Sequence, residues 1–497
     1  MDKIIDNKKL SSMLSDPSLL KDKAFVAGEW VNSAKGETFE IRNPATLEVI
    51  SKVPDLGLEE TRDAIDAAYV AQKLWSLKTG KERSLVLKKF YELMMVNADD
   101  LAMIITAEMG KPLAEAKGEI AYGASFIEFF AEEAKRIYGE TIPGYQADKK
   151  ILVIKQPIGV VTSITPWNFP NAMITRKLGP ALAAGCSFVA KPAEDTPLSA
   201  LAIAVIAERA GIPKGVLSII TSNKSHTIGE EFCSNSKVRK LTFTGSTEVG
   251  KILLKQGSSQ VLKMSMELGG NAPFIVFDDA DLDAAVAGAM ICKFRNAGQT
   301  CVCANRILVQ ENIYDDFITR LKEAAESLVI GDGKNDNVTI GPLINEKAAN
   351  DVIDFIEDAK GKGAEIVTGG NRSEEGNCFI EPTILGNVDQ SMRVFNEEIF
   401  GPIAPIFKFK TEQEAIEIAN KTEFGLACYF YSRDIGRIWR VGEALEFGIV
   451  GINEGIISNE MAPFGGIKES GQGREGSKYG LDDYLEIKYM CLGGIDN

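Results

Sequence analysis

Cys301 and Glu267 are the two residues whose types and settings could carry out covalent chemistry. Cys301 follows a Gly-Gln turn, and Glu267 lies within sequence reach of it in Met266-Glu-Leu-Gly-Gly270. A thiolate is the reactive form of cysteine, and exposed backbone N–H groups at a loop or helix start would lower its pKa and hold an oxyanion. The pair indicates a nucleophile and a base, although an isolated cysteine is more often a buried structural thiol.

Asn168 is a candidate for stabilising the charge that such a nucleophile creates. It lies in Pro166-Trp-Asn-Phe-Pro170, at the end of the apolar run 159–165. A strand there would bring its amide to the rim of a sheet, where the amide and the Cys301 N–H could both donate to an oxyanion. The alternative is that Asn168 caps the helix expected after Pro170.

The single histidine, His226, limits the other kinds of chemistry. It lies in a loop-like context without a nucleophile signature, so we expect a solvated surface residue rather than part of a Ser-His-Asp or Cys-His hydrolase. Zinc and non-haem iron sites usually recruit histidine, so we expect no catalytic metal. The base for the cysteine must then be a carboxylate, a lysine or nothing.

Composition and charge narrow the class of protein. The chain has 497 residues, 45% of them hydrophobic, which is enough for two or more domains with their own cores. Its net charge of −15 argues against nucleic-acid binding. No apolar run reaches eighteen residues, so no membrane span is expected. Residues 1–10 resemble neither a signal peptide nor a transit peptide, and the eight cysteines are too sparse for a disulfide scaffold, so we expect a cytoplasmic protein.

The elements that must position these residues alternate between strands and helices. Amphipathic helices dominate residues 58–135, broken at Gly110-Lys-Pro112. Strands are then predicted at 151–154, 159–164, 187–190, 216–220 and 240–243, and again at 307–309, 365–367, 403–407 and 448–452. Such alternation is typical of parallel α/β sheets, and we interpret the second set as a separate domain.

Taken together, these features resemble the aldehyde dehydrogenase superfamily, from about residue 25 to the C-terminus. The motifs that carry the resemblance are Pro166-Trp-Asn-Phe-Pro170, Lys191-Pro-Ala-Glu194, Phe243-Thr-Gly-Ser-Thr-Glu-Val-Gly250, Glu267-Leu-Gly-Gly270, Gly298-Gln-Thr-Cys301 and Glu398-Ile-Phe-Gly-Pro402. The resemblance implies that Cys301 is the nucleophile, Glu267 the general base and Asn168 the oxyanion holder. The implied reaction oxidises an aldehyde to an acid through a thiohemiacetal and a thioester on the cysteine.

The resemblance also implies the fold and the assembly. It implies an α/β protein with a Rossmann-like NAD-binding domain at 1–135 and 158–267 and an α/β catalytic domain at 268–471. Residues 136–157 and 472–497 would form a small β arm for oligomerisation. Members of this superfamily are usually dimers or tetramers, so a homodimer or homotetramer is expected.

A dinucleotide is the implied cofactor, and Glu194 favours NAD over NADP. A carboxylate there would bond to a ribose diol and repel a 2′-phosphate, although Lys191 and Glu194 could also form no more than a solvated salt bridge. The turn at 245–250 is expected to open a helix toward a pyrophosphate, a weak signal by itself. The implied cofactor-binding set is Thr165, Pro166, Trp167, Lys191, Glu194, Gly229, Gly245, Ser246, Leu268, Glu398 and Phe400.

Two arginines point to a substrate with a carboxylate. Arg176 and Arg295 are both tied to the catalytic segments, and guanidinium groups suit a carboxylate, although exposed arginines usually only solvate a helix face. In succinate-semialdehyde dehydrogenases, arginines in matching contexts and a serine matching Ser458 hold the substrate carboxylate. We therefore expect succinate semialdehyde, with glutarate semialdehyde hard to exclude. Glu460 near the pocket mouth would oppose an anion.

Cys303 adds a redox hypothesis. In some succinate-semialdehyde dehydrogenases the same Cys-x-Cys spacing allows a reversible disulfide with the nucleophile, which here would silence Cys301. Plain packing of Cys303 is the alternative.

Three other functions share parts of the pattern. A CoA-acylating dehydrogenase usually lacks a glutamate at the position of Glu267. A non-redox thiol esterase would not need the dinucleotide-type turns. A non-catalytic structural protein would not need the three catalytic residues together.

Overall fold

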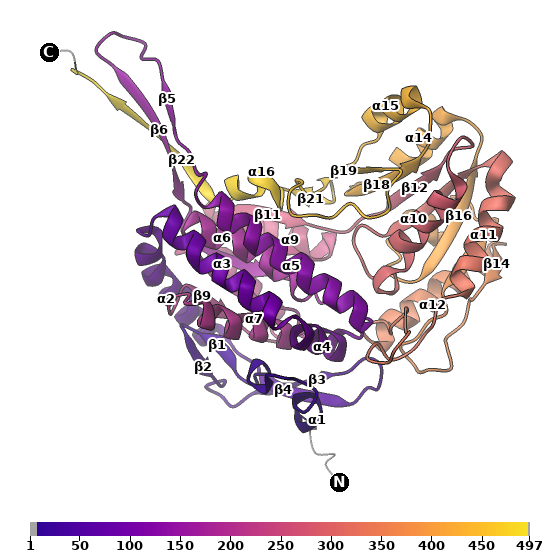
Figure 1. Ribbon diagram of the computed structural model, residues 1–497, viewed down its shortest axis with the longest axis horizontal. Helices are drawn as coiled ribbons and strands as arrows, with labels where there is room; N and C mark the ends of the chain where they lie inside the picture. The colour runs from indigo at the N-terminus through magenta and orange to yellow at the C-terminus, as the bar shows by residue number, and fades with distance from the viewer. Residues whose placement is uncertain (1–6, 496–497) are drawn as a thin grey trace.

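The computed structural model describes residues 7–495 (Figure 1). Residues 1–6 and 496–497, which the sequence analysis assigned to the first domain and to the arm, lie outside the described residues, as do most of those in the signal-peptide argument. Among the described residues, no helix is both long and apolar enough to cross a membrane.

The first large sheet has a parallel centre with antiparallel edges. Its strands run in the order β2 (Glu29–Val31), β1 (Ala24–Val26), β9 (Leu217–Ile219), β8 (Ser187–Lys191), β7 (Val160–Ile164), β10 (Val238–Thr244), β11 (Lys263–Glu267) and β21 (Gly471–Gln472). The strands from β9 to β11 are parallel, and their β-rich sequences are buried on both faces, as parallel sheets require.

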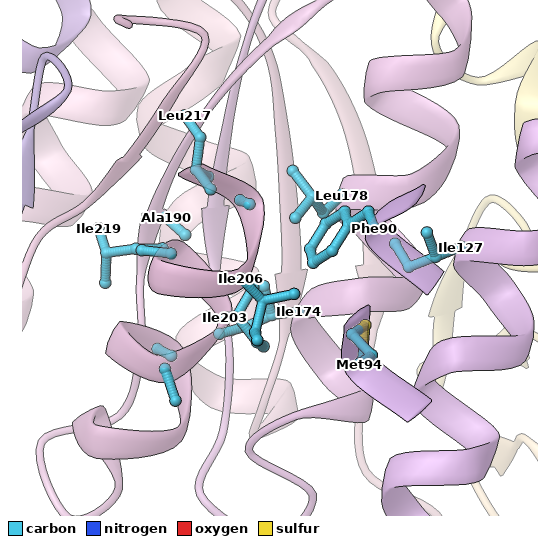
Figure 2. Close-up of a cluster of buried hydrophobic side chains, with 14 of the residues drawn as sticks. Phe90, Met94, Ile127, Ile174, Leu178, Ala190, Ile203, Ile206, Leu217 and Ile219 are labelled. Atoms are coloured by element: carbon cyan, nitrogen blue, oxygen red, sulfur yellow. The ribbon is translucent and has the colours of Figure 1, made fainter. Parts of the chain in front are cut away.

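Helices cover this sheet and provide its core. They are α2 (Leu58–Ser76), α3 (Gly80–Val96), α4 (Ala98–Met109), α5 (Leu113–Glu133), α6 (Ala172–Ala184), α7 (Pro197–Ala210), α8 (Ser225–Ser234) and α9 (Thr247–Gly257). Figure 2 shows Phe90 and Met94 of α3 near Leu178 of α6 and Ile127 of α5, with Ile203 of α7 beside them. All of these side chains are fully buried. Helix α6 is therefore fixed on several sides, which matters because it carries Arg176.

The second large sheet has its own hydrophobic core. Its strands are β14 (Glu365–Thr368), β15 (Thr383–Gly386), β16 (Ile403–Phe409), β13 (Ala304–Gln310), β12 (Ala272–Val276), β18 (Ala427–Tyr431) and β19 (Ile449–Ile452), in that order. All pairs are parallel except β14 with β15. Helices α10 (Leu282–Phe294), α11 (Tyr314–Glu326), α12 (Glu346–Gly361), α14 (Glu412–Asn420) and α15 (Ile435–Ala444) pack around it.

A three-stranded sheet projects from the body as an arm (Figure 1). It consists of β5 (Glu140–Ile142), β6 (Lys150–Pro157) and β22 (Leu485–Leu492), all antiparallel. Before β22, strand β21 pairs with β11 in the first sheet, and α16 (Ser477–Asp482) contacts α6. The smaller elements are α1 (Asn7–Ser11), α13 (Arg393–Asn396), β3 (Thr38–Arg42), β4 (Val49–Pro54), β17 (Phe424–Gly425) and β20 (Ile467–Lys468). The domain ranges given above stay a prediction.

The structure contains every strand that the sequence analysis predicted, and it adds others. The antiparallel strands β1 to β4 and the short strands β11 and β12 were missed, because few residues separate them from turns and their alternation is brief.

The prediction of a loop around His226 is wrong. His226 lies in the first turn of α8, where it is exposed, as expected of a surface histidine.

We predict that Leu178→Ala will lower the free energy of unfolding by about 2–5 kcal/mol, because a fully buried side chain leaves a cavity in α6 packing. The midpoint of urea unfolding measures this. Leu77→Ala is the control, since Leu77 is 80% exposed and its loss should change stability by no more than about 0.5 kcal/mol. Equal shifts for the two variants would contradict the packing described here.

Candidate active site

The carboxyl ends of neighbouring parallel strands bring several predicted residues to one edge of the first sheet. Ile164 at the end of β7 pairs with Lys191 of β8 and with Phe243 of β10. Thr244 of β10 pairs with Glu267, the last residue of β11. Ligands of open parallel sheets bind beyond this edge. The segments that follow these strands therefore surround a common space.

A tight turn places Cys301 between the two sheets, just before β13. Asn296, Ala297 and Gly298 follow α10 in left-handed conformation, with φ of 54°, 54° and 77°. A Cβ at Gly298 would collide with the carbonyl of Gly401, so glycine is required there. Backbone strain of this kind persists where packing enforces it, and functional sites often contain it.

Two cavities meet at Cys301. The first, the α5–α6 cavity, has a volume of about 270 Å³, and its wall includes Glu115, Tyr122, Arg176, Arg295, Ser458 and Phe464. The second, the sheet-edge cavity, has a volume of about 230 Å³ and includes Asn168 and Glu267. The half-buried Cys301 lines both. Two reactants, one in each cavity, would therefore meet at this thiol.

Most residues predicted to bind the cofactor line the sheet-edge cavity. The rings of Trp167 and Phe400 meet edge to face at 5.6 Å. Ser246 caps α9, whose first turn opens beside the cavity. Glu398 accepts the Gly270 N–H at 3.0 Å, and burial raises the pKa of this carboxyl group to about 7. The predicted residues in the wall are Pro166, Trp167, Gly245, Ser246, Leu268, Glu398 and Phe400.

The other four predicted cofactor residues lie outside that wall. Lys191 Nζ lies 3.2 Å from Glu194 Oε2, and the Glu194 side chain is 48% exposed. This is the salt bridge that the sequence analysis left open as an alternative. Gly229 is buried in α8 against α9, and Thr165 is buried at the end of β7. Cofactor contacts by these four residues stay a prediction.

Asn168 is fixed by bonds to the catalytic turn. Its side-chain amide donates to the carbonyl of Gln299 at 3.0 Å, which uses one of its two N–H groups. Asn296 donates from its side chain to the carbonyl of Asn168 at 3.1 Å. The capping alternative is not what the structure contains, because Glu119 accepts the N–H groups of Asn171 and Ala172 where α6 begins. The second N–H of the Asn168 amide is free to donate to a group bound in the sheet-edge cavity.

The three residues predicted to hold a substrate carboxylate all line the α5–α6 cavity. Arg176 and Ser458 approach from α6 and from the loop after β19, and Arg295 comes from the end of α10. Arg295 lies over the ring of Phe169, with its guanidinium carbon 5.5 Å from the ring centre. Glu460, a concern because of its charge, accepts a hydrogen bond from Ser125 at 3.1 Å and is not in the cavity wall.

Glu475, which sequence reasoning missed, connects the two cavities. Its carboxylate forms buried ion pairs with Arg176, at 2.5 Å, and with Lys177. Lys177 also donates to Thr244 at 2.6 Å, in the wall of the sheet-edge cavity. Burial acts to lower the pKa of Arg176, but the Glu475 carboxylate outweighs it, and Arg176 stays charged.

Burial makes both the thiol and the base hard to ionise. Burial raises the pKa of Cys301 to about 12, against the opposing charge of Arg176. This contradicts our expectation that the turn lowers the pKa of the thiol. Burial and the negative charge of Glu475 raise the pKa of Glu267 well above its ordinary value, and its carboxylate oxygens have no hydrogen-bond partner among the described residues. Burial thus disfavours the charged form of both groups, which line the same sheet-edge cavity.

Cys303 is buried and lies outside the walls of both cavities. It donates to the carbonyl of Lys293 at 3.5 Å, while the thiol of Cys292 donates to the carbonyl of Val302 at 3.6 Å. These reciprocal contacts place Cys303 beside the end of α10, as the packing alternative expects. Both Cys301 and Cys303 are free thiols in the structure, and the redox role stays a prediction.

Several residues that shape the site have only weak sequence signals. Glu115, Glu119 and Tyr122 are spaced four and three residues apart, which places them on one face of α5, toward the cavity. That spacing could have been recognised in the sequence. The role of Glu475 could not have been predicted, because nearly 300 residues separate it from its partners Arg176 and Lys177.

Comparison with known proteins agrees with this geometry. A family model described as the aldehyde dehydrogenase family matches residues 30–490. The chain belongs to this family. The aldehyde dehydrogenase is 60% identical over 480 residues to the NADP+-dependent succinate-semialdehyde dehydrogenase of Escherichia coli strain K12, with 97% of this chain and 99% of that protein covered. It is also 60% identical to a glutarate-semialdehyde dehydrogenase of Pseudomonas aeruginosa, with 97% and 100% covered.

A solved structure extends the agreement to the fold. The crystal structure of a succinate-semialdehyde dehydrogenase from Burkholderia pseudomallei matches with a TM-score of 0.96 at 58% identity, covering 97% of this chain and 99% of the other. The family and the fold class predicted from the sequence are thus confirmed. Among the described residues of this aldehyde dehydrogenase, no group of three or more histidine, cysteine or acidic side chains could hold a metal ion.

We predict that alkylation of Cys301 by iodoacetamide, without substrate or cofactor, will speed up about tenfold per pH unit from about pH 7 to 10. The reason is that a thiol with a pKa of about 12 has a thiolate fraction that rises tenfold with each pH unit below that value. Peptide mapping of the labelled protein measures the rate, and Cys301→Ser identifies labelling of other thiols. A plateau near pH 8 would contradict the raised pKa.

We predict that Cys303→Ala will keep its activity after mild hydrogen peroxide treatment that inactivates the parent enzyme reversibly, because a disulfide can no longer form with Cys301. Dehydrogenase activity before and after a thiol reductant is the measurement. Cys292→Ala is the matched control, since it removes the buried thiol beside Cys303 and leaves the Cys-x-Cys pair. Equal loss of activity in Cys303→Ala and the parent would refute the redox role.

Proposed function

We propose that this aldehyde dehydrogenase oxidises short aldehydes that carry a terminal carboxylate, with succinate semialdehyde as the preferred substrate. The observation that carries this proposal is the α5–α6 cavity, where Arg176, Arg295 and Ser458 line a space that opens on Cys301. Relatives at 60% identity act on semialdehydes with terminal carboxylates according to their names.

The charge balance of the cavity supports an anionic substrate. Among the described residues, no carboxylate forms an ion pair with Arg295, whereas Arg176 is paired with Glu475. Glu119 is neutralised by Lys111 at 2.6 Å. Burial raises the pKa of Glu115, which favours its uncharged form. The partly buried guanidinium of Arg295 thus has no carboxylate in an ion pair with it among the described residues, and a guanidinium group suits a substrate carboxylate.

The catalytic roles follow from the positions of three side chains at Cys301. The thiol adds to the aldehyde carbonyl after losing its proton, and the free N–H of Asn168 and the N–H of Cys301 hold the resulting oxyanion. Collapse of the oxyanion, with loss of a hydride to the acceptor that a bound dinucleotide would supply, leaves a thioester on Cys301. Glu267 then takes a proton from the water that hydrolyses this thioester, which releases the acid and the thiol. A carboxylate with a raised pKa is a stronger base once it is ionised.

The sheet-edge cavity fits a nicotinamide dinucleotide. The start of α9 suits a pyrophosphate, and the carboxylate of Glu398 suits a ribose hydroxyl pair. When bound, the nicotinamide would supply the hydride acceptor for the oxidation. We favour NAD because the exposed carboxylate of Glu194 would repel a 2′-phosphate, although the Escherichia coli relative is named as NADP+-dependent.

The length of the substrate is less tightly determined than its charge. Relatives named for succinate semialdehyde and for glutarate semialdehyde are equally similar to this chain. One methylene changes transition-state binding by only about 1–3 kcal/mol in an apolar pocket. Glutarate semialdehyde is therefore the second candidate substrate.

We propose a cytoplasmic homodimer or homotetramer that joins through the arm. Apolar side chains of the arm are exposed in the single chain, including Ile142 at 44%, Ile487 at 72% and Tyr489 at 58%. Exposed apolar groups on a projecting sheet are typical of an interaction surface.

The test compares the parent enzyme with Arg295→Met on succinate semialdehyde, glutarate semialdehyde and butanal, with NAD and with NADP. We expect the parent to prefer the carboxylated aldehydes and NAD. Arg295→Met should lower kcat/KM for succinate semialdehyde about 10- to 150-fold, because charge-assisted bonds to the carboxylate are lost. NADH formation at steady state is the measurement.

Arg239→Met, which changes an arginine on β10 outside both cavity walls, is the control and should behave like the parent. A parent enzyme that oxidises butanal as efficiently as succinate semialdehyde would overturn the carboxylate proposal and leave the aldehyde dehydrogenase chemistry in place.

A further inference from the structure

Tyr122 of α5 lies at the centre of the group of residues proposed to hold the substrate carboxylate. Its side chain lines the α5–α6 cavity together with Arg176, Arg295 and Ser458. Its hydroxyl oxygen accepts a hydrogen bond from Arg176 Nη1 at 3.4 Å. Ser458 lines the same cavity and acts to lower the pKa of Tyr122.

The ring of Tyr122 is held in place by packing. It meets the ring of Phe126, one turn along α5, edge to face at 5.1 Å and 84°. Phe126 is fully buried and also lies under the guanidinium of Arg176, 5.6 Å from the ring centre. The two aromatic rings and the guanidinium therefore form one packed cluster. The position of the hydroxyl group is set before any substrate binds, which limits the entropy lost on binding.

The hydroxyl group keeps its proton in this setting. Burial raises the pKa of Tyr122, although the charges of Arg176 and Arg295 act to lower it. A hydroxyl that accepts a bond from Arg176 still has one O–H to donate. That O–H is available to an anion in the cavity, and it adds a donor without adding charge.

We propose that Tyr122 is a specificity-determining residue, whose hydroxyl group donates to the substrate carboxylate and orients Arg176 toward it. This inference rests on the proposed function. It adds a neutral donor to the two guanidinium groups and the serine, and it gives α5 a direct part in choosing carboxylated over uncharged aldehydes.

The test uses Tyr122→Phe in the full-length enzyme with its cofactor. We expect KM for succinate semialdehyde to rise about tenfold or more, because a hydrogen bond to a charged group is lost. We expect kcat for this substrate to change by less than about threefold, since the hydroxyl does not touch the reacting carbonyl. KM for butanal should stay within about twofold, because butanal has no carboxylate.

A binding measurement separates recognition from catalysis. Succinate should protect Cys301 from alkylation in the parent enzyme, and its dissociation constant should rise in Tyr122→Phe by about the same factor as KM. Tyr314→Phe is the matched control, because it removes a buried hydroxyl that donates to the carbonyl of Ile406 at 3.2 Å in the second sheet. This control should match the parent in both measurements.

The outcomes are distinguishable. Equal increases in KM for succinate semialdehyde and butanal would mean that the variant has disturbed packing, and unchanged KM for both would mean that the hydroxyl does not contact the carboxylate. Either result overturns the role of Tyr122. A parent enzyme without preference for carboxylated aldehydes would instead overturn the proposed function, and that result is obtained before any variant is made.

Discussion

The buried ion pair between Lys111 and Glu119 is the constraint on which the geometry of the site depends. Lys111 donates to the Asn168 carbonyl at 2.8 Å, and Glu119 accepts the first N–H groups of α6. The ion pair thus fixes the backbone of Asn168, which lines the sheet-edge cavity with Cys301. It also fixes the first turn of α6, the helix that carries Arg176. Both side chains are at most 1% exposed, and a buried pair of this kind is tolerated only when further hydrogen bonds satisfy it. Here the backbone around Asn168 supplies them.

A second buried network, formed by Glu475 with Arg176 and Lys177, gives the two arginines of the cavity different roles. Arg176 is held by Glu475, which also holds Lys177 and raises the pKa of Glu267. Arg176 therefore contributes a guanidinium group whose position is fixed by its ion pair with Glu475. Arg295 contributes a guanidinium group that forms no ion pair with a carboxylate among the described residues.

The raised pKa values of Cys301 and Glu267 follow from burial. Surroundings of low polarity strengthen each hydrogen bond to a developing oxyanion, and they also disfavour isolated charges. The same burial raises the pKa of the nucleophile Cys301 to about 12, which makes its thiolate less abundant.

The sequence by itself determined the family, the α/β class and the residues at Cys301, because local motifs specify turns and strand ends within a few residues. Cys301, Glu267 and Asn168 follow such motifs, and the structure brings all three to one cavity. Only the tertiary structure decided which charges are paired, how high the pKa of Cys301 stands and which carbonyl the thiol of Cys303 contacts. Those properties depend on burial and on partners such as Glu475, nearly 300 residues from Arg176. Local pattern carries no information about such distant contacts, since they form only when separate elements pack together.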